Sequence, residues 1–240
     1  TDVTGTSYLM QDHGAKVLRS MDAADVINAQ FAAGGPGASV AAPPPLLNPI
    51  TRLSETNALA VQLQSVAKII AANAVLGMRR QIFFVSMDGF DNHDMQNSTQ
   101  SPLLARLAHA MSYFDGVMAN LNGIDVRPQV TTFTASDFSR KFSTNGDGTD
   151  HAWGSHQFVM GGAVNGRNIY GQFPTVGVDQ AGFSNPDMSG DFLVPSMSVD
   201  QYAGTLGRWF GLSEGQLDSI FPNLRNFNRD VGFMGAATAT

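Results

Sequence analysis

The chain has 240 residues, of which 43% are hydrophobic and 14% charged, and its formal net charge is −6. This balance is typical of a globular protein with a sizeable core rather than of a disordered chain. Because no basic stripe is present to neutralise phosphates, we expect no nucleic-acid partner. The absence of cysteine excludes disulfides, thiolate zinc sites and cysteine nucleophiles, so any transition metal must be held by His, Asp or Glu. We also expect no transmembrane segment, because no apolar run approaches roughly 18 residues.

The first third of the chain is expected to consist of two helices joined by a linker. Residues 8–32 carry apolar side chains at loosely helical spacing and predict the first helix. Clusters of Gly and Pro in residues 35–51 predict a linker without regular structure. In residues 52–77 apolar side chains recur at helical spacing, and Gly77 stands where the second helix should end.

The middle of the chain has the pattern strand, helix, strand. "QIFFVSM" (81–87) is a short and nearly continuous apolar run, typical of a strand buried on both faces of a parallel sheet. Ser101 and Pro102 predict the N-cap and first turn of a helix that Gly123 ends. "QVTTFTA" (129–135) is rich in β-branched residues and predicts a second strand.

The last third adds a strand, two helices and a tail. "QFVMGGAV" (157–164) predicts a third strand, with residues 167–173 as a short hairpin partner. Residues 199–212 and 214–221 predict helices, and residues 234–240 a flexible tail. Strands that alternate with helices predict an α/β fold with a mainly parallel sheet flanked by helices.

Polar side chains cluster where two of these strands end. "DGFDNHD" directly follows the strand that ends at Met87, and "SDF" follows the strand that ends at Ala135. Ligands of open α/β sheets bind beyond the carboxyl ends of the strands, so both clusters should meet there with the loop "NGDGTDHAWGSH" nearby. The converging candidates are Asp88, Asp91, His93, Asp94, Asp137, Asp147, Asp150, His151 and His156.

Carboxylate and imidazole are the ligands that zinc accepts when thiolates are absent, and manganese and iron fit the same set. Two such ions bridged by a carboxylate would suit phosphoryl or sulfuryl transfer. In the alternative interpretation, these residues only cap strand ends and hydrogen-bond the backbone. Calcium is not expected, because "NGDGTD" lacks the ligand spacing and terminal Glu of a calcium loop. No phosphate-binding glycine loop, dinucleotide fingerprint or G-x-S-x-G motif is present.

Four segments in this order resemble the DUF1501 family of bacterial exported proteins, from about Arg52 to Phe233. They are "RRQIFFVSMDGFDNHDMQ", "VTTFTASDFSRKFSTNGDGTDHAWGSHQFVMGGAVNGRNIYGQFP", "VPSMSVDQYAGTLGRWFGL" and "FPNL". The resemblance implies a relation to the alkaline phosphatase and sulfatase superfamily. It also implies a periplasmic or secreted location and, if the protein is active, metal-dependent hydrolysis of phosphate or sulfate esters.

The resemblance further implies a divalent-metal site, with zinc as the first choice. Its ligands would be Asp91, His93, Asp137, Asp150, His151 and His156. Asp137 is followed by Phe138, where the superfamily has a His, so His151 with Asp150 would supply the missing imidazole. Arg140 would bind the oxyanion of the substrate, and the alternative is that it only forms a surface salt bridge.

The resemblance also implies a division of the chain. An N-terminal helical segment (1–34) and a linker (35–51) would precede residues 52–233, the C-terminal part of a larger alkaline-phosphatase-like α/β domain. The nucleophile of the superfamily belongs to the N-terminal half, so we expect that missing half, or another chain, to cover an exposed sheet. The alternative is a non-catalytic exported scaffold or assembly protein that retains the hydrolase fold.

Overall fold

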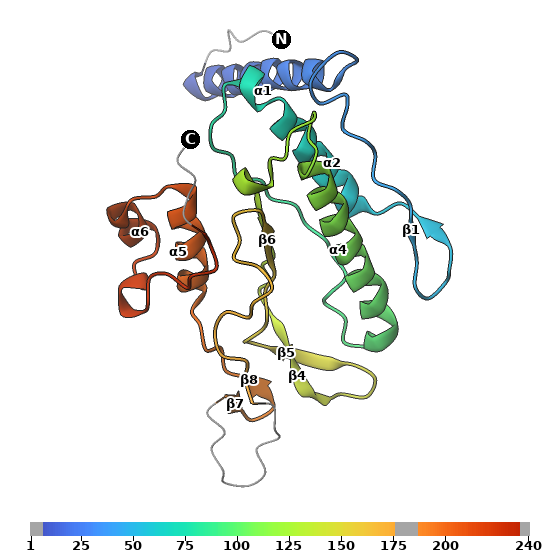
Figure 1. The fold of residues 1–240 in the computed structure, drawn as a ribbon, viewed down its shortest axis with the longest axis vertical. Helices are drawn as coiled ribbons and strands as arrows, with labels where there is room; N and C mark the ends of the chain where they lie inside the picture. Colours follow the sequence, from blue (N-terminus) through green and yellow to red (C-terminus); the bar gives the residue numbers. More distant parts are fainter. Residues whose placement is uncertain (1–6, 176–186, 236–240) are drawn as a thin grey trace.

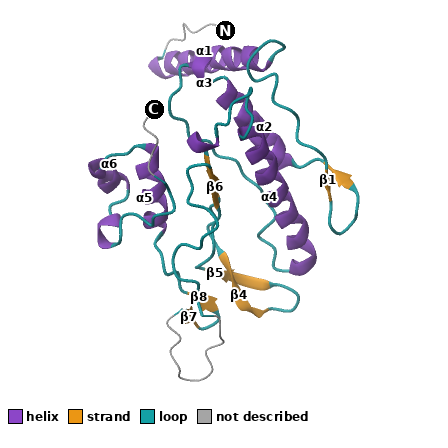
Figure 2. Ribbon diagram, viewed as in Figure 1, coloured by secondary structure: helices purple, strands orange, loops and turns teal. Residues whose placement is uncertain are grey.

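The structure is a computed structural model that describes residues 7–175 and 187–235 (Figures 1 and 2). Its helices are α1 (Tyr8–Phe31), α2 (Ala58–Ala71), α3 (Asn73–Leu76), α4 (Gln96–Met118), α5 (Val199–Phe210) and α6 (Glu214–Ile220), with the 3₁₀ turns η1 (Arg127–Gln129) and η2 (Leu224–Asn226). Its strands are β1 (Leu46–Leu47), β2 (Ser54–Glu55), β3 (Thr131–Phe133), β4 (Ser139–Thr144), β5 (Thr149–Ala152), β6 (Val159–Gly161), β7 (Met188–Ser189) and β8 (Phe192–Leu193). None of the described helices is long and apolar enough to span a membrane.

The main core lies between α2 and α4, which run side by side (Figure 1). Leu59 and Leu63 of α2 and Phe114 and Met118 of α4 are buried there. The side chain of Asn57 begins α2, because its Oδ1 accepts a hydrogen bond from the Leu59 N–H at 3.1 Å. The helix α1 lies across one end of this pair and buries none of its own residues fully (Figure 1).

The prediction of an α/β fold with a mainly parallel sheet flanked by helices is wrong. Within the described part of the chain the strands form four separate antiparallel pairs: β1–β2, β3–β6, β4–β5 and β7–β8. The second and third predicted strands, 129–135 and 157–164, do exist as β3 and β6, but they pair antiparallel with Thr131 opposite Gly161. No strand is found in residues 167–173.

The segment 81–87 explains much of this difference. It has no regular secondary structure and pairs with no strand of the described residues. Phe83 and Val85 pack against the α2–α4 core, whereas Ile82 and Phe84 are 79% and 92% exposed. An apolar run predicts a strand buried on both faces only if elements cover both faces and neighbouring strands pair with its backbone. Here only one face is covered.

The boundaries of two helices also differ from the predictions. The second helix begins at Ala58 rather than at residue 52, because Ser54–Glu55 pairs with Leu46–Leu47. The α4 helix begins at Gln96 and ends at Met118, so Pro102 lies inside it rather than at its first turn. Its first N–H groups are partly satisfied from outside the helix, since Gln96 N–H donates to the Asp147 carbonyl at 3.0 Å. The predicted helices at 8–32, 199–212 and 214–221 are confirmed, and the predicted tail lies largely outside the described residues.

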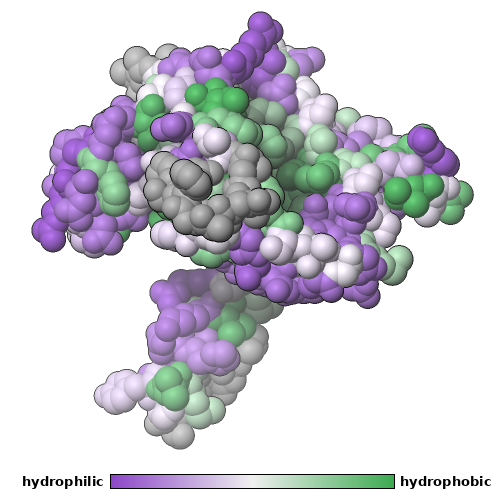
Figure 3. All heavy atoms as spheres, turned by 90° about the horizontal axis from the view of Figure 1, so that it is seen from below, coloured by the Kyte–Doolittle hydropathy of each residue, from purple (hydrophilic) through white to green (hydrophobic). Residues whose placement is uncertain are grey.

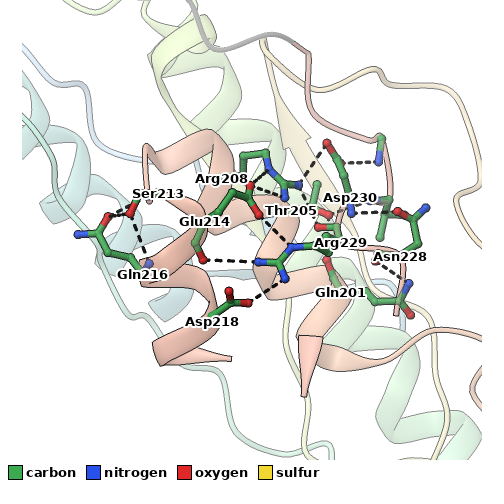
Figure 4. Close-up of polar contacts among 12 residues, drawn as sticks. Gln201, Thr205, Arg208, Ser213, Glu214, Gln216, Asp218, Asn228, Arg229 and Asp230 are labelled. Atoms are coloured by element: carbon green, nitrogen blue, oxygen red, sulfur yellow. Dashed lines mark hydrogen bonds and ion pairs between the residues drawn. The ribbon is translucent and has the colours of Figure 1, made fainter. Parts of the chain in front are cut away.

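The C-terminal helices α5 and α6 are joined by a network of charged and polar side chains (Figure 4). Glu214 accepts hydrogen bonds from Arg208 at 2.8 Å and from Arg229 at 2.9 Å, and Arg229 also pairs with Asp218 at 2.8 Å. The α5 helix reaches the β3–β6 pair through Tyr202, whose hydroxyl donates to the Thr134 carbonyl at 3.1 Å. Burial raises the pKa of this hydroxyl well above its ordinary value of 10.0, so it stays a donor at every physiological pH.

The surface opposite the helical end is mainly hydrophilic. Seen from below, it carries apolar side chains in small separate patches (Figure 3). The β4–β5 hairpin lies at this end of the molecule, away from α1 (Figure 1). The segment between residue 88 and the start of α4 contacts the hairpin there, and these two pieces form the candidate site.

Candidate metal centre

Two loop residues and one strand residue bring their ligand atoms together. Asp91 and His93 lie in the segment before α4, and His151 lies on β5. One ligand atom from each lies within 4.8 Å of the others. His151 Nε2 is 2.7 Å from Asp91 Oδ1, and His93 Nδ1 is 3.4 Å from the same oxygen. Side chains separated by about 60 residues in the sequence thus form one cluster.

Hydrogen bonds and a close backbone approach hold the loop and the hairpin in this arrangement. Gln96 N–H donates to the Asp147 carbonyl at 3.0 Å, and the Thr149 hydroxyl donates to Gln96 Oε1 at 2.9 Å. Gly148 lies directly against His93, because a Cβ at position 148 would be 2.3 Å from the His93 carbonyl oxygen. Only a residue without a side chain allows this approach of the two backbones.

Aromatic and cationic side chains surround His151. The Phe138 ring stacks on the His151 ring with centroids 4.0 Å apart and planes 10° apart, and the His93 ring centroid is 4.6 Å away. The guanidinium carbon of Arg140 lies 5.2 Å from the centroid of Phe138. These contacts restrict the orientation of the His151 ring, as the supporting residues of a metal ligand do.

Arg140 ties the hairpin to the loop. Its Nη1 donates to the Thr149 carbonyl at 2.6 Å and its Nη2 to the Phe90 carbonyl at 2.5 Å. Both terminal nitrogens therefore have protein partners in this structure. The predicted role of Arg140 in binding a substrate oxyanion stays a prediction, and it would require at least one remaining N–H to face the site.

The other three predicted ligands lie outside the cluster of three. Asp137 is exposed in the turn before β4. Asp150 Oδ1 accepts a hydrogen bond from Asn145 at 3.2 Å, and the His156 ring stacks on Phe173 with centroids 5.1 Å apart. The structure therefore groups half of the predicted ligands, and a ligand role for the rest stays a prediction.

A pair of carboxyl groups stands next to the cluster. Asp94 follows His93, and a hydrogen bond with the Asp147 carboxyl raises the pKa of Asp94, with repulsion between the two charges as a second cause. The pair adds negative charge beside the three ligand atoms. This charge favours the approach of a cation.

The sequence pointed to the three ligand residues but missed the residues that hold them together. Gly148 and Gln96 were not among the candidates, although the glycines of "NGDGTD" are a signal of close backbone approach. Gln96 carries no sequence signal of this kind, since its partner Thr149 is 53 residues away.

The donor set fits a divalent transition metal. Two imidazole nitrogens and one carboxylate oxygen are a set that zinc accepts, and iron(II) and manganese also bind such ligands. The side chains of Asp91, His93 and His151 are 66%, 45% and 40% exposed, which leaves room for water or a substrate as a further ligand. The arrangement can therefore hold a solvent-accessible ion, as a catalytic site requires.

Comparison with known proteins gives one result. Neither curated proteins nor solved structures give a match to this chain. A family model described as "Protein of unknown function (DUF1501)" matches residues 10–221 and includes Asp91, His93 and His151. The match extends further toward the N-terminus than the segments that suggested the resemblance, and it includes most of α1. The chain belongs to the DUF1501 family.

Proposed function

We propose that the protein binds one divalent transition-metal ion, zinc in the first place, through Asp91, His93 and His151, and hydrolyses phosphate or sulfate esters. The observation that carries the proposal is the convergence of three ligand atoms within 4.8 Å of one another. No lysine or arginine neutralises Asp91 in the described structure, where its ion-pair partners are the two histidines. A cation that replaces the hydrogen shared by His151 Nε2 and Asp91 Oδ1 would bring three lone-pair donors to one point.

A bound ion would lower the pKa of a coordinated water and polarise the ester oxygen. The residues of the chain would orient and support the site. His151 would exchange its contact with Asp91 for the ion, while Phe138 keeps the imidazole ring in place by stacking. Gly148 would keep the loop and the hairpin at the distance that the three ligands need.

The choice of phosphate or sulfate esters rests on the resemblance of the sequence motifs to the alkaline phosphatase and sulfatase superfamily. The same resemblance is the basis for a periplasmic or secreted location. An open, solvent-accessible ligand set is compatible with hydrolysis, because the attacking water and the ester both need access to the ion.

The metal site is tested by elemental analysis of extensively dialysed protein. We expect nearly one equivalent of metal in the wild type and its loss in His151→Ala and His93→Ala. His13→Ala is the matched control, because it removes a histidine of α1 that belongs neither to the three grouped side chains nor to the predicted ligands. A metal-free wild type that zinc titration also fails to load would overturn the proposal.

The hydrolytic activity is tested separately. The metal-loaded protein is assayed with p-nitrophenyl phosphate and p-nitrophenyl sulfate, with and without a chelator. Turnover that the chelator and His151→Ala both remove supports the hydrolase. A protein that binds metal but cleaves neither ester keeps the metal site and rejects this substrate class.

A second candidate function is a non-catalytic exported scaffold, and the segment 81–87 favours it. Ile82 and Phe84 are exposed, and the hydrogen bonds of this backbone within the described structure are those between Ser86 and the Gln62 side chain. A strand from another chain would pair with this backbone and cover the apolar side chains. Self-association that Phe84→Ser prevents, measured by sedimentation, would support this function, and a monomer unaffected by the substitution would count against it.

A further inference from the structure

A cavity lies between the linker and α4, remote in sequence from the candidate metal centre. Its volume is about 540 Å³. This value falls within the roughly 300–1,000 Å³ that is usual for small-molecule sites. Residues 39–44 of the linker form one wall, and α4 with the turn after it forms the other. In Figure 1 the linker runs from α1 past α2 and α4 toward β1.

Side-chain hydrogen bonds hold the linker wall in place. The Tyr113 hydroxyl donates to the Ala41 carbonyl at 2.6 Å, and Asn122 Nδ2 donates to the Pro36 carbonyl at 3.1 Å. Ser39 also donates to Asn122 Oδ1. Contacts at several points of the linker keep the cavity from closing by collapse of the wall, so the space is preformed.

The lining restricts the chemistry of a ligand. Val40, Pro44, Val117 and Leu121 make much of the surface apolar, and none of the lining residues is Asp, Glu, Lys or Arg. A charged group would lose its hydration without gaining a counter-ion, which is costly. The cavity therefore favours an uncharged ligand with a mainly apolar body.

His109 adds one specific polar group. Asn57 Oδ1 accepts from the Leu59 N–H at the start of α2, which directs Asn57 Nδ2 toward the Arg106 carbonyl at 2.7 Å and His109 Nδ1 at 3.1 Å. Because Nδ2 is a donor, Nδ1 of the neutral imidazole accepts, and Nε2 carries the hydrogen. The capping bond of one helix thus sets the tautomer of a histidine on another.

His109 lines the cavity, and its Nε2 is buried without a hydrogen-bond partner in the described structure. An unpaired buried donor is unfavourable, so an acceptor atom that reaches it is stabilised. Because water does not reach this nitrogen, a ligand oxygen contacts it only when a side chain that covers it moves.

We infer that this cavity binds a neutral, mainly apolar small molecule that presents a carbonyl, ether or hydroxyl oxygen to His109. The inference does not depend on the metal centre, because none of the lining residues belongs to it. It therefore adds a second site to the protein, whatever the outcome for the first.

Gly116 offers a variant that removes the cavity without damaging the fold. It lies on α4, it lines the cavity, and a Cβ at this position would meet no heavy atom within 4 Å. Gly116→Leu should therefore fill the cavity, and a helix-favouring residue in place of glycine should not lower the stability of α4. Gly215→Leu is the matched control, because Gly215 is helical, equally open and far from the cavity in sequence.

The test uses the neutral fluorescent ketone 6-propionyl-2-(dimethylamino)naphthalene as the probe. Its naphthalene body is apolar and its carbonyl is an acceptor. We expect saturable, one-to-one binding with a blue-shifted emission for the wild type and for Gly215→Leu. Affinity should fall about tenfold or more in Gly116→Leu, because the added side chain occupies the space of the probe.

A second variant separates the hydrogen bond from the space. His109→Phe keeps a ring of similar size and removes the Nε2 donor, so it should weaken binding of the ketone but leave binding of naphthalene unchanged. Circular dichroism and thermal unfolding establish that each variant is folded. The inference is overturned if the wild type shows no saturable binding, or if Gly116→Leu binds the probe as the wild type does.

Discussion

The charged cluster of the C-terminal helices and the candidate metal centre differ in how their charges are matched. Glu214 lies between two guanidinium groups, those of Arg208 and Arg229. Asp91 lies between two imidazoles, His93 and His151. Arginine is always a donor, whereas a neutral imidazole also presents a lone pair. The first cluster is complete by itself, whereas under the proposed function a cation would complement the second one.

The energetic roles of the two clusters should differ accordingly. Complementary pairs stabilise the packing of α6 and the C-terminal segment against α5, even though exposed pairs each contribute modestly. Converging lone-pair donors contribute little to folding until an ion is bound, and then the binding free energy adds to stability. Variants in the two regions should therefore separate stability from metal binding.

The largest effect on stability is expected in the C-terminal helices α5 and α6 and the turn η2. Leu224 is fully buried and packs against Gly204, so Leu224→Ala leaves a cavity. We expect it to lower the free energy of unfolding by about 2–5 kcal/mol, the usual range for such a truncation. Urea unfolding measures the loss. The zinc affinity of the folded fraction should not change. If the stability and the zinc affinity both fell, the C-terminal helices and the metal centre would not be independent.

Gly148→Ala should break the metal centre without altering a ligand. The new Cβ would collide with the His93 carbonyl and push the loop from the hairpin. We expect zinc affinity to fall by roughly 10–100-fold, the usual cost of losing a supporting contact. Isothermal titration calorimetry measures it. Gly215→Ala is the control, and equal affinities of both variants would reject the close approach as a requirement.

Arg229→Met should affect stability and leave metal binding intact. Its loss removes partners of Glu214 and Asp218. Hydrogen bonding to Arg208, with Arg229 as a further cause, lowers the pKa of Glu214 below its ordinary value of 4.5. A lowered carboxyl pKa stabilises the folded state above the unfolded value, and this contribution is lost as the pH falls through the folded value. The difference in Tm between wild type and variant should therefore be present at pH 7 and shrink below the ordinary Glu range.

The smallest effect is expected for Asp147→Asn, which should raise the stability of the folded state rather than lower it. The Asp147 carboxyl raises the pKa of Asp94, so ionising both groups at neutral pH opposes folding. The substitution should raise Tm slightly at pH 7 and make no difference at acid pH, where both carboxyls are protonated. A lower Tm at pH 7 would show that the pair instead stabilises the contact between the loop and the hairpin.

Local patterns in the sequence were enough to predict individual helices, the strand β3 and the kinds of ligand. Patterns within short segments were sufficient to predict α1, α5 and α6, because the helical spacing of apolar residues acts within a few residues. The β-branched run predicted β3. The lack of cysteine, together with the His and Asp residues at strand ends, predicted a larger set of candidate ligands that includes Asp91, His93 and His151. Family membership was likewise readable from the motifs.

How these elements pair and pack against one another follows from long-range contacts in the folded chain. Whether 81–87 pairs in a sheet depends on strands that lie elsewhere in the chain or outside it, so an apolar run could not determine it. Which candidates converge depends on the docking of the β4–β5 hairpin against the loop before α4, through Gln96 and Gly148. The tautomer of His109 depends on Asn57, 52 residues away. Each of these outcomes depends on contacts between residues distant in the sequence, and residue types and local spacing contain no record of such contacts.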